Sequence, residues 1–427
     1  MSTPGADTPA HRSLIHHTDF RHLWAGDALG QFGAMLTAFA LPVFAVQSLH
    51  ATEWQMGLLN AAESSAFLVI GLPAGAWVDR MLKRRVLILA DLARAALLAG
   101  LVVTAVTGHA SIPLLIGVAL GYSVATVFFD VAHQSYVPGL VGLEHIMEGN
   151  AKLQATQSVA QVGAPAVGGL LLRVMAAPWL IAFNVVAYLV SAVLVARIRK
   201  PETLPSPESR RPLRTEIWEG LSFVIRQPLL RRIVACTSIG NLGNSAAYAV
   251  STIFVLRTLG LEPAVYGLIG SASAAGGLLA AVFAERITRR IGEGRAIPWS
   301  AVAMGGAFAL TPLAALVPTA PEIPLIAGGF LFSWFVVLYN VAQVSYRQRL
   351  CPPALLGRMN ASVRFIVWGT VPIGGLLGGL LGTALGVVPT LWFGVALIAL
   401  SALPVLLSPM RTMRDLPTPD HAASGTA

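Results

Sequence analysis

Two acidic residues, Asp27 and Glu63, lie within strongly apolar stretches of this sequence, and neither has a basic residue close to it in the chain. A carboxyl group that is buried without a cation can load and release a proton, or it can balance the charge of a cationic ligand. Alternatively, each could be a protonated carboxyl group that donates a hydrogen bond at a helix contact. The sequence leaves both interpretations open.

Other ionisable residues also lie within apolar stretches, and each needs a partner or water because charge at bilayer depth is costly. Asp91 and Arg94 are three residues apart, so on a helix they share a face and can neutralise each other. Asp130 lies near the end of its stretch, where we expect it to meet a basic residue of the segment 83–85. The remaining members of this group are His133 and Arg364.

The segment 71–85 reads GLPAGAWVDRMLKRR and joins an apolar stretch to a charged one. Gly71 and Gly75 are four residues apart, a spacing that lets another helix approach closely. A signal that stops a membrane helix explains the basic residues but not Asp79, whose carboxylate should have a basic or helix-terminus partner. The basic residues are Arg80, Lys83, Arg84 and Arg85.

These residues must be positioned by membrane-spanning helices. The chain has 427 residues, of which 55% are hydrophobic and 11% charged, and its mean hydropathy of +0.70 excludes an ordinary soluble protein. Taking a span as roughly 17 to 25 apolar residues, the sequence predicts an all-α membrane protein with twelve of them. The predicted spans are 22–46, 56–78, 86–106, 112–131, 154–172, 179–197, 232–256, 265–284, 296–317, 323–343, 362–385 and 388–408.

The distribution of Lys and Arg predicts the orientation. With both termini in the cytoplasm, the outward loops hold only Arg173 and Arg257 of the 29 basic residues, and 25 lie on the cytoplasmic side. The net charge of +9 is therefore explained by topology rather than by nucleic-acid binding. The first 18 residues are polar, so no cleavable signal peptide is expected. The two cysteines, Cys236 and Cys351, fit no metal or disulfide pattern.

An internal repeat divides the chain. Arg21, Gly30 and Gly33 recur as Arg231, Gly240 and Gly243 at an offset of 210, and three further matches keep this offset. The proline-rich, charged segment between the repeats predicts a cytoplasmic linker, amphipathic over 216–226. The expected units are an N-terminal tail 1–19, six-helix bundles 20–198 and 229–408, the linker 199–228 and a C-terminal tail 409–427.

The pattern G-x-x-x-D-R-x-x-R/K-R/K, which begins at Gly75, resembles the loop between helices two and three of the major facilitator superfamily. Leu82 departs from it, because the family usually has glycine there. Within the superfamily, FRHLWAGDALGQFG, DRMLKRRVLILADLARA and GNAKLQATQSVAQVGAPAVGG resemble the branch of macrolide-type drug efflux proteins and siderophore exporters. The resemblance implies two pseudo-symmetric bundles of six helices, consistent with the parallel repeat.

The resemblance also implies roles for these residues. A conformational gate would contain Gly75, Asp79, Arg80, Lys83, Arg84, Asp91, Arg94 and Asp130, with a contact at Asp130 that breaks when the cavity opens inward. Spans one, four, seven and ten would line the cavity. Polar and aromatic stripes on them are Gln31; Tyr122, Thr126, Phe129 and His133; Asn241, Asn244 and Tyr248; and Phe332, Phe335 and Tyr339. Such stripes are also common in helix cores.

The fifth span contains Gly163, Pro165, Gly168 and Gly169, similar to a glycine-proline motif of antiporters in this superfamily. Ala164 departs from that motif, and close helix packing would explain the glycines equally well. Gly117 stands where many drug antiporters carry an arginine, so proton transfer through that arginine is excluded.

Together these features predict a monomeric secondary transporter of a bacterial cytoplasmic membrane that exports a hydrophobic or amphipathic small molecule against proton entry. Proton coupling is expected at Glu63 or Asp27. No nucleotide loop, metal-spaced cluster or nucleophile motif is present, so we expect no enzyme, cofactor, nucleotide or nucleic-acid partner. Uptake of a metabolite, or a sensor that moves no solute, are the alternatives.

Overall fold

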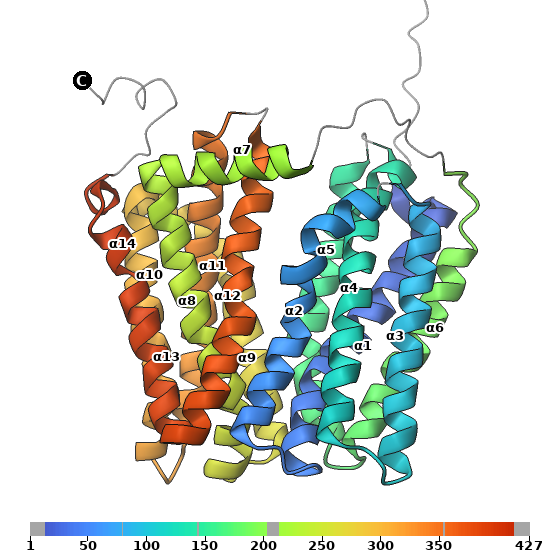
Figure 1. The fold of residues 1–427 in the computed structure, drawn as a ribbon, viewed down its shortest axis with the longest axis horizontal. Helices are drawn as coiled ribbons and strands as arrows, with labels where there is room; N and C mark the ends of the chain where they lie inside the picture. Colours follow the sequence, from blue (N-terminus) through green and yellow to red (C-terminus); the bar gives the residue numbers. More distant parts are fainter. Residues whose placement is uncertain (1–12, 79, 143–144, 203–212, 353–354, 414–427) are drawn as a thin grey trace, which may run out of the picture.

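The computed structural model describes residues 13–78, 80–142, 145–202, 213–352 and 355–413. Within this part of the chain, every predicted span coincides with a helix (Figure 1). Judged on the described residues alone, ten of these helices are long and apolar enough to cross a membrane, and α2 and α5 are not among these ten. The helices of the first half are α1 (Thr18–Gln47), α2 (Glu53–Val78), α3 (Lys83–Val106), α4 (Ile112–Val141), α5 (Ile146–Leu171) and α6 (Ala177–Ala196), preceded by the short η1 (Leu14–His16).

The second half begins with α7 (Leu213–Arg226), the amphipathic segment predicted within the linker. The spans of this half are α8 (Pro228–Ile253), α9 (Pro263–Ile291), α10 (Glu293–Leu313), α11 (Glu322–Leu350), α12 (Leu356–Leu385) and α13 (Val387–Ser401). Short elements complete them: the π-helical turn η3 (Phe254–Thr258), η4 (Ala314–Leu316), α14 (Leu403–Leu406) and η6 (Pro409–Arg411).

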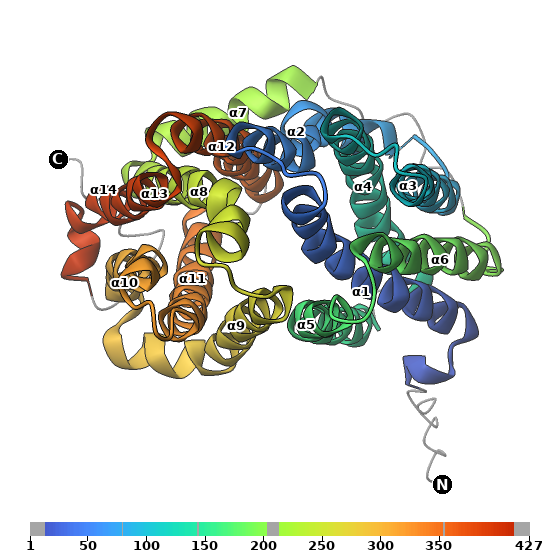
Figure 2. The same ribbon diagram turned by 90° about the horizontal axis from the view of Figure 1, so that it is seen from below.

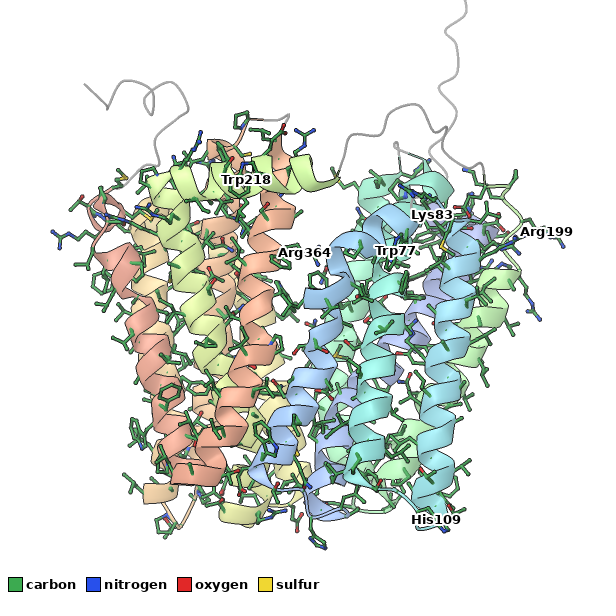
Figure 3. The ribbon with its side chains drawn as sticks, viewed as in Figure 1. Trp77, Lys83, His109, Arg199, Trp218 and Arg364 are labelled. Carbon is green, nitrogen blue, oxygen red and sulfur yellow. The ribbon has the colours of Figure 1, made fainter. Side chains whose placement is uncertain are left out.

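The helices form two bundles, α1 to α6 and α8 to α13, which stand side by side (Figures 1 and 2). Helix α7 lies across one end of the second bundle and packs on α12 and α8. We call this end of the molecule the α7 end and the opposite end the far end. Lys83 and Arg199 lie at the α7 end, and His109 lies at the far end (Figure 3).

Several helices are longer at the α7 end than the sequence predicts. Helix α4 continues to Val141 rather than ending at 131, because Tyr136, Val137 and Leu140 are buried in a hydrophobic cluster there. Helix α5 begins at Ile146 rather than at 154. The apolar stretch that crosses a membrane is therefore shorter than the helix that contains it, and protein packing stabilises the rest.

The two bundles contact each other along two seams, α2 with α12 and α5 with α9. Helix backbones approach closely at glycines in both seams. A Cβ atom at Gly169 would lie 2.9 Å from the carbonyl oxygen of Pro263, and one at Gly57 would lie 2.6 Å from that of Gly375. At the far end, Arg173 of the first bundle also forms an ion pair with Glu262 of the second, at 2.9 Å. The bundles are therefore closed against each other at the far end.

Candidate functional site

Three adjoining cavities occupy the first bundle and its face toward the second. The largest, which we call the vestibule, has a volume of about 780 Å³ and lies between the α7-end parts of α4 and α5. Solvent-exposed polar side chains line it, so it is open to water. The polar lining residues are Asp27, Gln31, Asp130, His133, Gln134, Asn150, Gln154 and Gln157.

Two smaller cavities adjoin the vestibule. The polar chamber, of about 250 Å³, shares Asp27, Gln31 and Asp130 with it and also contains Arg94. The apolar chamber, of about 300 Å³, lies between α1, α2 and α4 and shares Asp130 with both. Glu63 and Trp368 are part of its lining. The predicted residues Gln31, Tyr122, Thr126, Phe129 and His133 all line at least one of these cavities.

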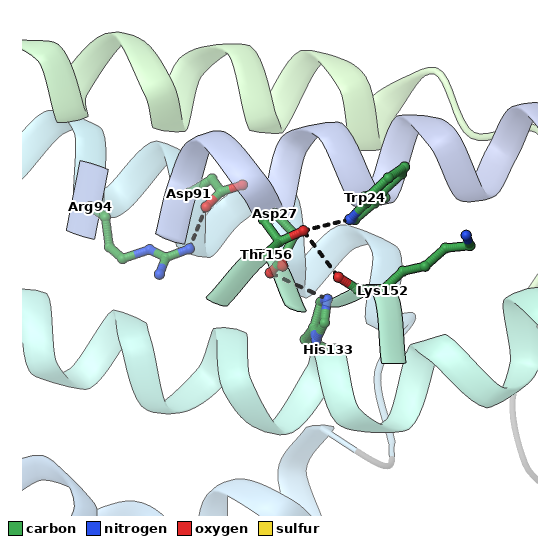
Figure 4. A network of polar contacts seen from close by, with 7 residues as sticks. All are labelled: Trp24, Asp27, Asp91, Arg94, His133, Lys152 and Thr156. Carbon is green, nitrogen blue, oxygen red and sulfur yellow. Dashed lines mark hydrogen bonds and ion pairs between the residues drawn. The ribbon is translucent and has the colours of Figure 1, made fainter. Parts of the chain in front are cut away.

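Asp27 is buried, and its carboxylate lies 3.6 Å from Nε2 of His133 (Figure 4). The two residues belong to α1 and α4, so this contact crosses the bundle. Next to it, the indole Nε1 of Trp24 donates to Thr156 Oγ1 at 2.8 Å. The sequence places no cation near Asp27, but the fold supplies an imidazole. Asp27 is therefore part of a polar network that reaches the vestibule.

Asp91 and Arg94 form a buried ion pair on α3, as their spacing predicts (Figure 4). The guanidinium group lies between two aromatic rings, 4.0 Å from the centroid of Phe129 and 4.2 Å from that of Tyr188. Tyr188 in turn shares a hydrogen bond of 2.5 Å with the hydroxyl group of Tyr122. Phe129 thus lines the polar chamber, and its ring also packs against the Arg94 guanidinium group.

Glu63 lies on α2, and its side chain lines the apolar chamber. Its backbone carbonyl accepts a hydrogen bond from Ser123 Oγ at 2.7 Å, which joins α2 to α4. The carboxylate takes part in no ion pair within the described ranges. The rings of Phe67 and Trp368 lie beside the same chamber, with centroids 5.8 Å apart.

The predicted contact between Asp130 and the basic segment 83–85 is absent from this conformation. Asp130 is exposed to the cavities instead. The backbone N–H groups of Lys83 and Arg84 donate to the carboxylate of Glu202 at 2.7 and 3.1 Å, and Lys83 Nζ lies 3.9 Å from it. Arg84 also donates to the carbonyl groups at the end of α6.

The structure places the remaining described residues of the charged segment 71–85 in different surroundings. Arg80 is exposed, and Asp79 lies outside the described residues. A Cβ atom at Gly75 would meet no atom within 4 Å, and one at Gly71 would meet only Phe67 of its own helix. The close helix approach predicted at these two glycines is therefore not present here.

The glycine-proline motif of α5 lies at helix contacts. A Cβ atom at Gly168 would lie 2.8 Å from the ring of Phe39, and one at Gly163 would lie 3.9 Å from the ring of Phe32. Pro165 and Gly169 meet α9 across the seam between the bundles. These contacts favour packing as the explanation of the motif.

The polar and aromatic stripes predicted on helices of the second bundle do not line the cavities described above. Tyr339 is buried in the core, where its hydroxyl group lies 2.8 Å from Thr237 Oγ1. Phe332 packs on Phe308, with ring centroids 5.1 Å apart. Asn241 donates to a backbone carbonyl of α12 at 3.2 Å. None of the stripe residues lines the three cavities described above: Asn241, Asn244, Tyr248, Phe332, Phe335 and Tyr339.

The sequence-based prediction of the cavity did not include α5, which contributes amide side chains to the vestibule. Asn150, Gln154, Gln157 and Gln161 are spaced so that they share one face of this helix. The first three line the vestibule, and Gln154 and Gln161 also line a crevice of about 290 Å³ between α5, α9 and α11. The signal was available, because three of these amides, Gln154, Gln157 and Gln161, fall on one face of the predicted span 154–172. Tyr188, Phe67 and Trp368 had no comparable signal.

Comparisons with known proteins agree with this arrangement. The chain is 25% identical to the enterobactin exporter EntS of Escherichia coli strain 536, over 97% of each chain. It is equally similar to EntS of Citrobacter koseri, over 96% of this chain and 97% of the relative.

Solved structures share the fold. A bacterial homologue of the iron transporter ferroportin in its inward-facing state has a TM-score of 0.73 at 17% identity, covering 93% of this chain and 99% of that one. A bacterial homologue of ferroportin in its outward-facing state has a TM-score of 0.57 at 18% identity, covering 91% of this chain and 98% of that one. A variant of the nucleoside transporter NupG scores 0.75 at 11% identity, with 91% and 99% covered.

A family model described as transmembrane secretion effector matches residues 11–423. This chain therefore belongs to the transmembrane secretion effector family of the major facilitator superfamily.

Proposed function

We propose that this protein exports an amphipathic small molecule, siderophore-like or drug-like, across a bacterial cytoplasmic membrane by alternating access. The observation that carries the proposal is the cavity system itself, which is open at the α7 end while both seams close the far end. Amides and carboxylates line the vestibule, and aliphatic and aromatic side chains line the apolar chamber. A molecule with one polar and one apolar part would satisfy both. The relatives named as enterobactin exporters support export rather than uptake.

The α7 end should face the cytoplasm, because it carries most of the basic residues. A reporter fused after Arg199 is therefore expected to show a cytoplasmic location, and one fused after Leu49 a periplasmic location. Alkaline phosphatase and fluorescent-protein fusions measure both. A reversed pattern would contradict the orientation and, with it, the direction of export.

Proton entry is the proposed energy source, and Asp27 is the better placed of the two candidate acids. Its carboxylate contacts His133 and borders the vestibule, which is accessible to water, so a proton has a route to and from it. Glu63 is the second candidate. Asp27→Asn is expected to abolish uphill efflux driven by a pH gradient while sparing downhill exchange, because binding and alternation do not require the proton.

Proteoliposomes loaded with an uncharged substrate decide between the acids. Efflux is measured with an imposed pH gradient and then without one, for Asp27→Asn, Glu63→Gln and the double variant. Glu285→Gln serves as the control, because this carboxylate is exposed at the end of α9. If the double variant still pumps uphill, neither acid carries the proton.

A further inference from the structure

Most hydroxyl groups around the apolar chamber already have partners within the protein. Ser64 Oγ donates to the carbonyl of Asn60 at 2.9 Å, and Ser123 Oγ donates to that of Glu63. Thr37 accepts from Asn184 at 2.7 Å. Few hydroxyl groups of the chamber are therefore left for a ligand. The aliphatic part of its walls consists of Ala34, Ala38, Leu41, Leu98, Val118, Ala119 and Val127.

The polar groups that remain include two carboxylates, those of Glu63 and Asp130, and the unpartnered hydroxyl group of Thr126. Asp130 also borders the polar chamber, which contains Arg94, and the vestibule, which contains His133. Glu63 borders only the apolar chamber among the three cavities. In the described part of the chain its carboxylate has neither an ion-pair partner nor a side-chain hydrogen bond. An acid in such surroundings is most stable when a positive charge lies next to it.

The aromatic residues Phe67 and Trp368 line the apolar chamber together with Glu63. Phe67 lies one helical turn from Glu63 on α2, and Trp368 reaches the chamber from α12 of the other bundle. The guanidinium carbon of Arg364 lies 4.9 Å from the centroid of the Phe67 ring. Figure 3 shows Arg364 between the two bundles, toward the α7 end. The Phe67 face thus already attracts a cation, and that cation comes from an exposed, movable side chain.

We propose that the apolar chamber binds the cationic group of an amphipathic substrate, such as an amine or a quaternary onium centre. Glu63 balances the charge, and Phe67 and Trp368 contact the organic groups around it. Arg364 competes for the same aromatic face. This inference rests on the proposed export function and adds the charge of the substrate to it.

The same lining discriminates against anions. An anion in the chamber would lie beside Glu63 and Asp130, and none of the described residues that line the chamber is a Lys, Arg or His that could compensate the repulsion. A neutral molecule would fill the apolar walls but would leave the Glu63 carboxylate without a counter-charge. The chamber is therefore selective for positive charge rather than for apolar bulk alone.

Tetraphenylphosphonium and tetraphenylborate test this selectivity, because they have nearly the same size and shape but opposite charge. Binding of each to the purified full-length protein in an uncharged detergent is measured by equilibrium dialysis. We expect tetraphenylphosphonium to bind at least tenfold more tightly. Equal affinities for the two ions would overturn the proposal.

Three variants locate the site. Glu63→Gln is expected to weaken tetraphenylphosphonium binding at least tenfold, whereas Arg364→Gln is expected to strengthen it severalfold by removing the competing cation. Glu285→Gln, the exposed control, should leave the affinity for tetraphenylphosphonium unchanged. An unchanged affinity in Glu63→Gln, or a weaker one in Arg364→Gln, contradicts the proposal. Arg364→Gln remains decisive even if Glu63→Gln does not fold.

Efflux of an uncharged amphipathic dye from proteoliposomes separates this inference from the proposed function. Efflux of the dye without selective phosphonium binding would refute only the cationic site. If the wild-type protein moves neither the dye nor the phosphonium ion, the export function itself is wrong.

Discussion

Asp91→Asn is expected to destabilise the protein by about 3–5 kcal/mol, because it leaves a buried guanidinium group without its counter-ion. Asp91 is 0% exposed and Arg94 is 4% exposed, so the ion pair is largely shielded from bulk water. The rings of Phe129 and Tyr188 supply only part of the compensation, since a cation–π contact is weaker than a buried ion pair. Thermal unfolding of the detergent-solubilised protein measures the effect.

The double variant Asp91→Asn/Arg94→Met provides the matched test. It removes both charges and keeps an apolar side chain of similar length between the two rings, so it should recover much of the lost stability. Glu285→Gln breaks the exposed pair with Arg289 and should cost less than about 1 kcal/mol. If the unfolding temperature of the double variant is no higher than that of Asp91→Asn, the ion pair is not what stabilises α3 in the bundle.

Gly267→Val should abolish transport without reducing the amount of protein in the membrane. A Cβ atom at Gly267 would overlap the carbonyl oxygen of Pro165 and lie 3.1 Å from the Cα atom of Gly169, so a side chain there forces α9 away from α5. The closed far end is then disfavoured relative to the open one. A shift of about 2.7 kcal/mol already changes the ratio of the two states a hundredfold.

Spin labels on either side of this seam report the shift. Leu170 of α5 and Leu268 of α9 are more than half exposed, and both native cysteines are buried, so labelled cysteines at these two positions can be distinguished. The distance between the labels should lengthen in Gly267→Val. Gly100→Val is the control, because a Cβ atom there meets nothing within 4 Å. An unchanged distance together with normal transport would mean that this seam does not control the alternation.

The sequence predicted those features that depend on neighbours in the chain. Asp91 and Arg94 share a helix face, so their pairing follows from spacing alone. The positions of the spans follow from hydropathy in the same way. The helix ends do not, since α4 continues to Val141 on contacts with other helices.

Contacts between helices could not be read from one sequence. The approach of His133 to Asp27 depends on how α1 and α4 pack, and nothing in the 105 residues between these positions indicates it. Tyr339 is the converse case, a residue that the sequence places in the cavity and the structure places in the core. Its stripe has helical spacing, but the spacing is the same whether the face meets a cavity or a core, and here it meets the core.

The amide-rich face of α5 has a consequence for how the chain is assembled. During synthesis each span must leave the translocation channel for lipid, and a helix with Asn150, Gln154, Gln157 and Gln161 on one face gains little free energy from that step. Helix α5 is therefore expected to wait at the channel until α6 has emerged, and to partition into the bilayer packed against α1. Its biogenesis thus depends on its neighbours, and the polarity that lines the transport route is compatible with the membrane only within the assembled bundle.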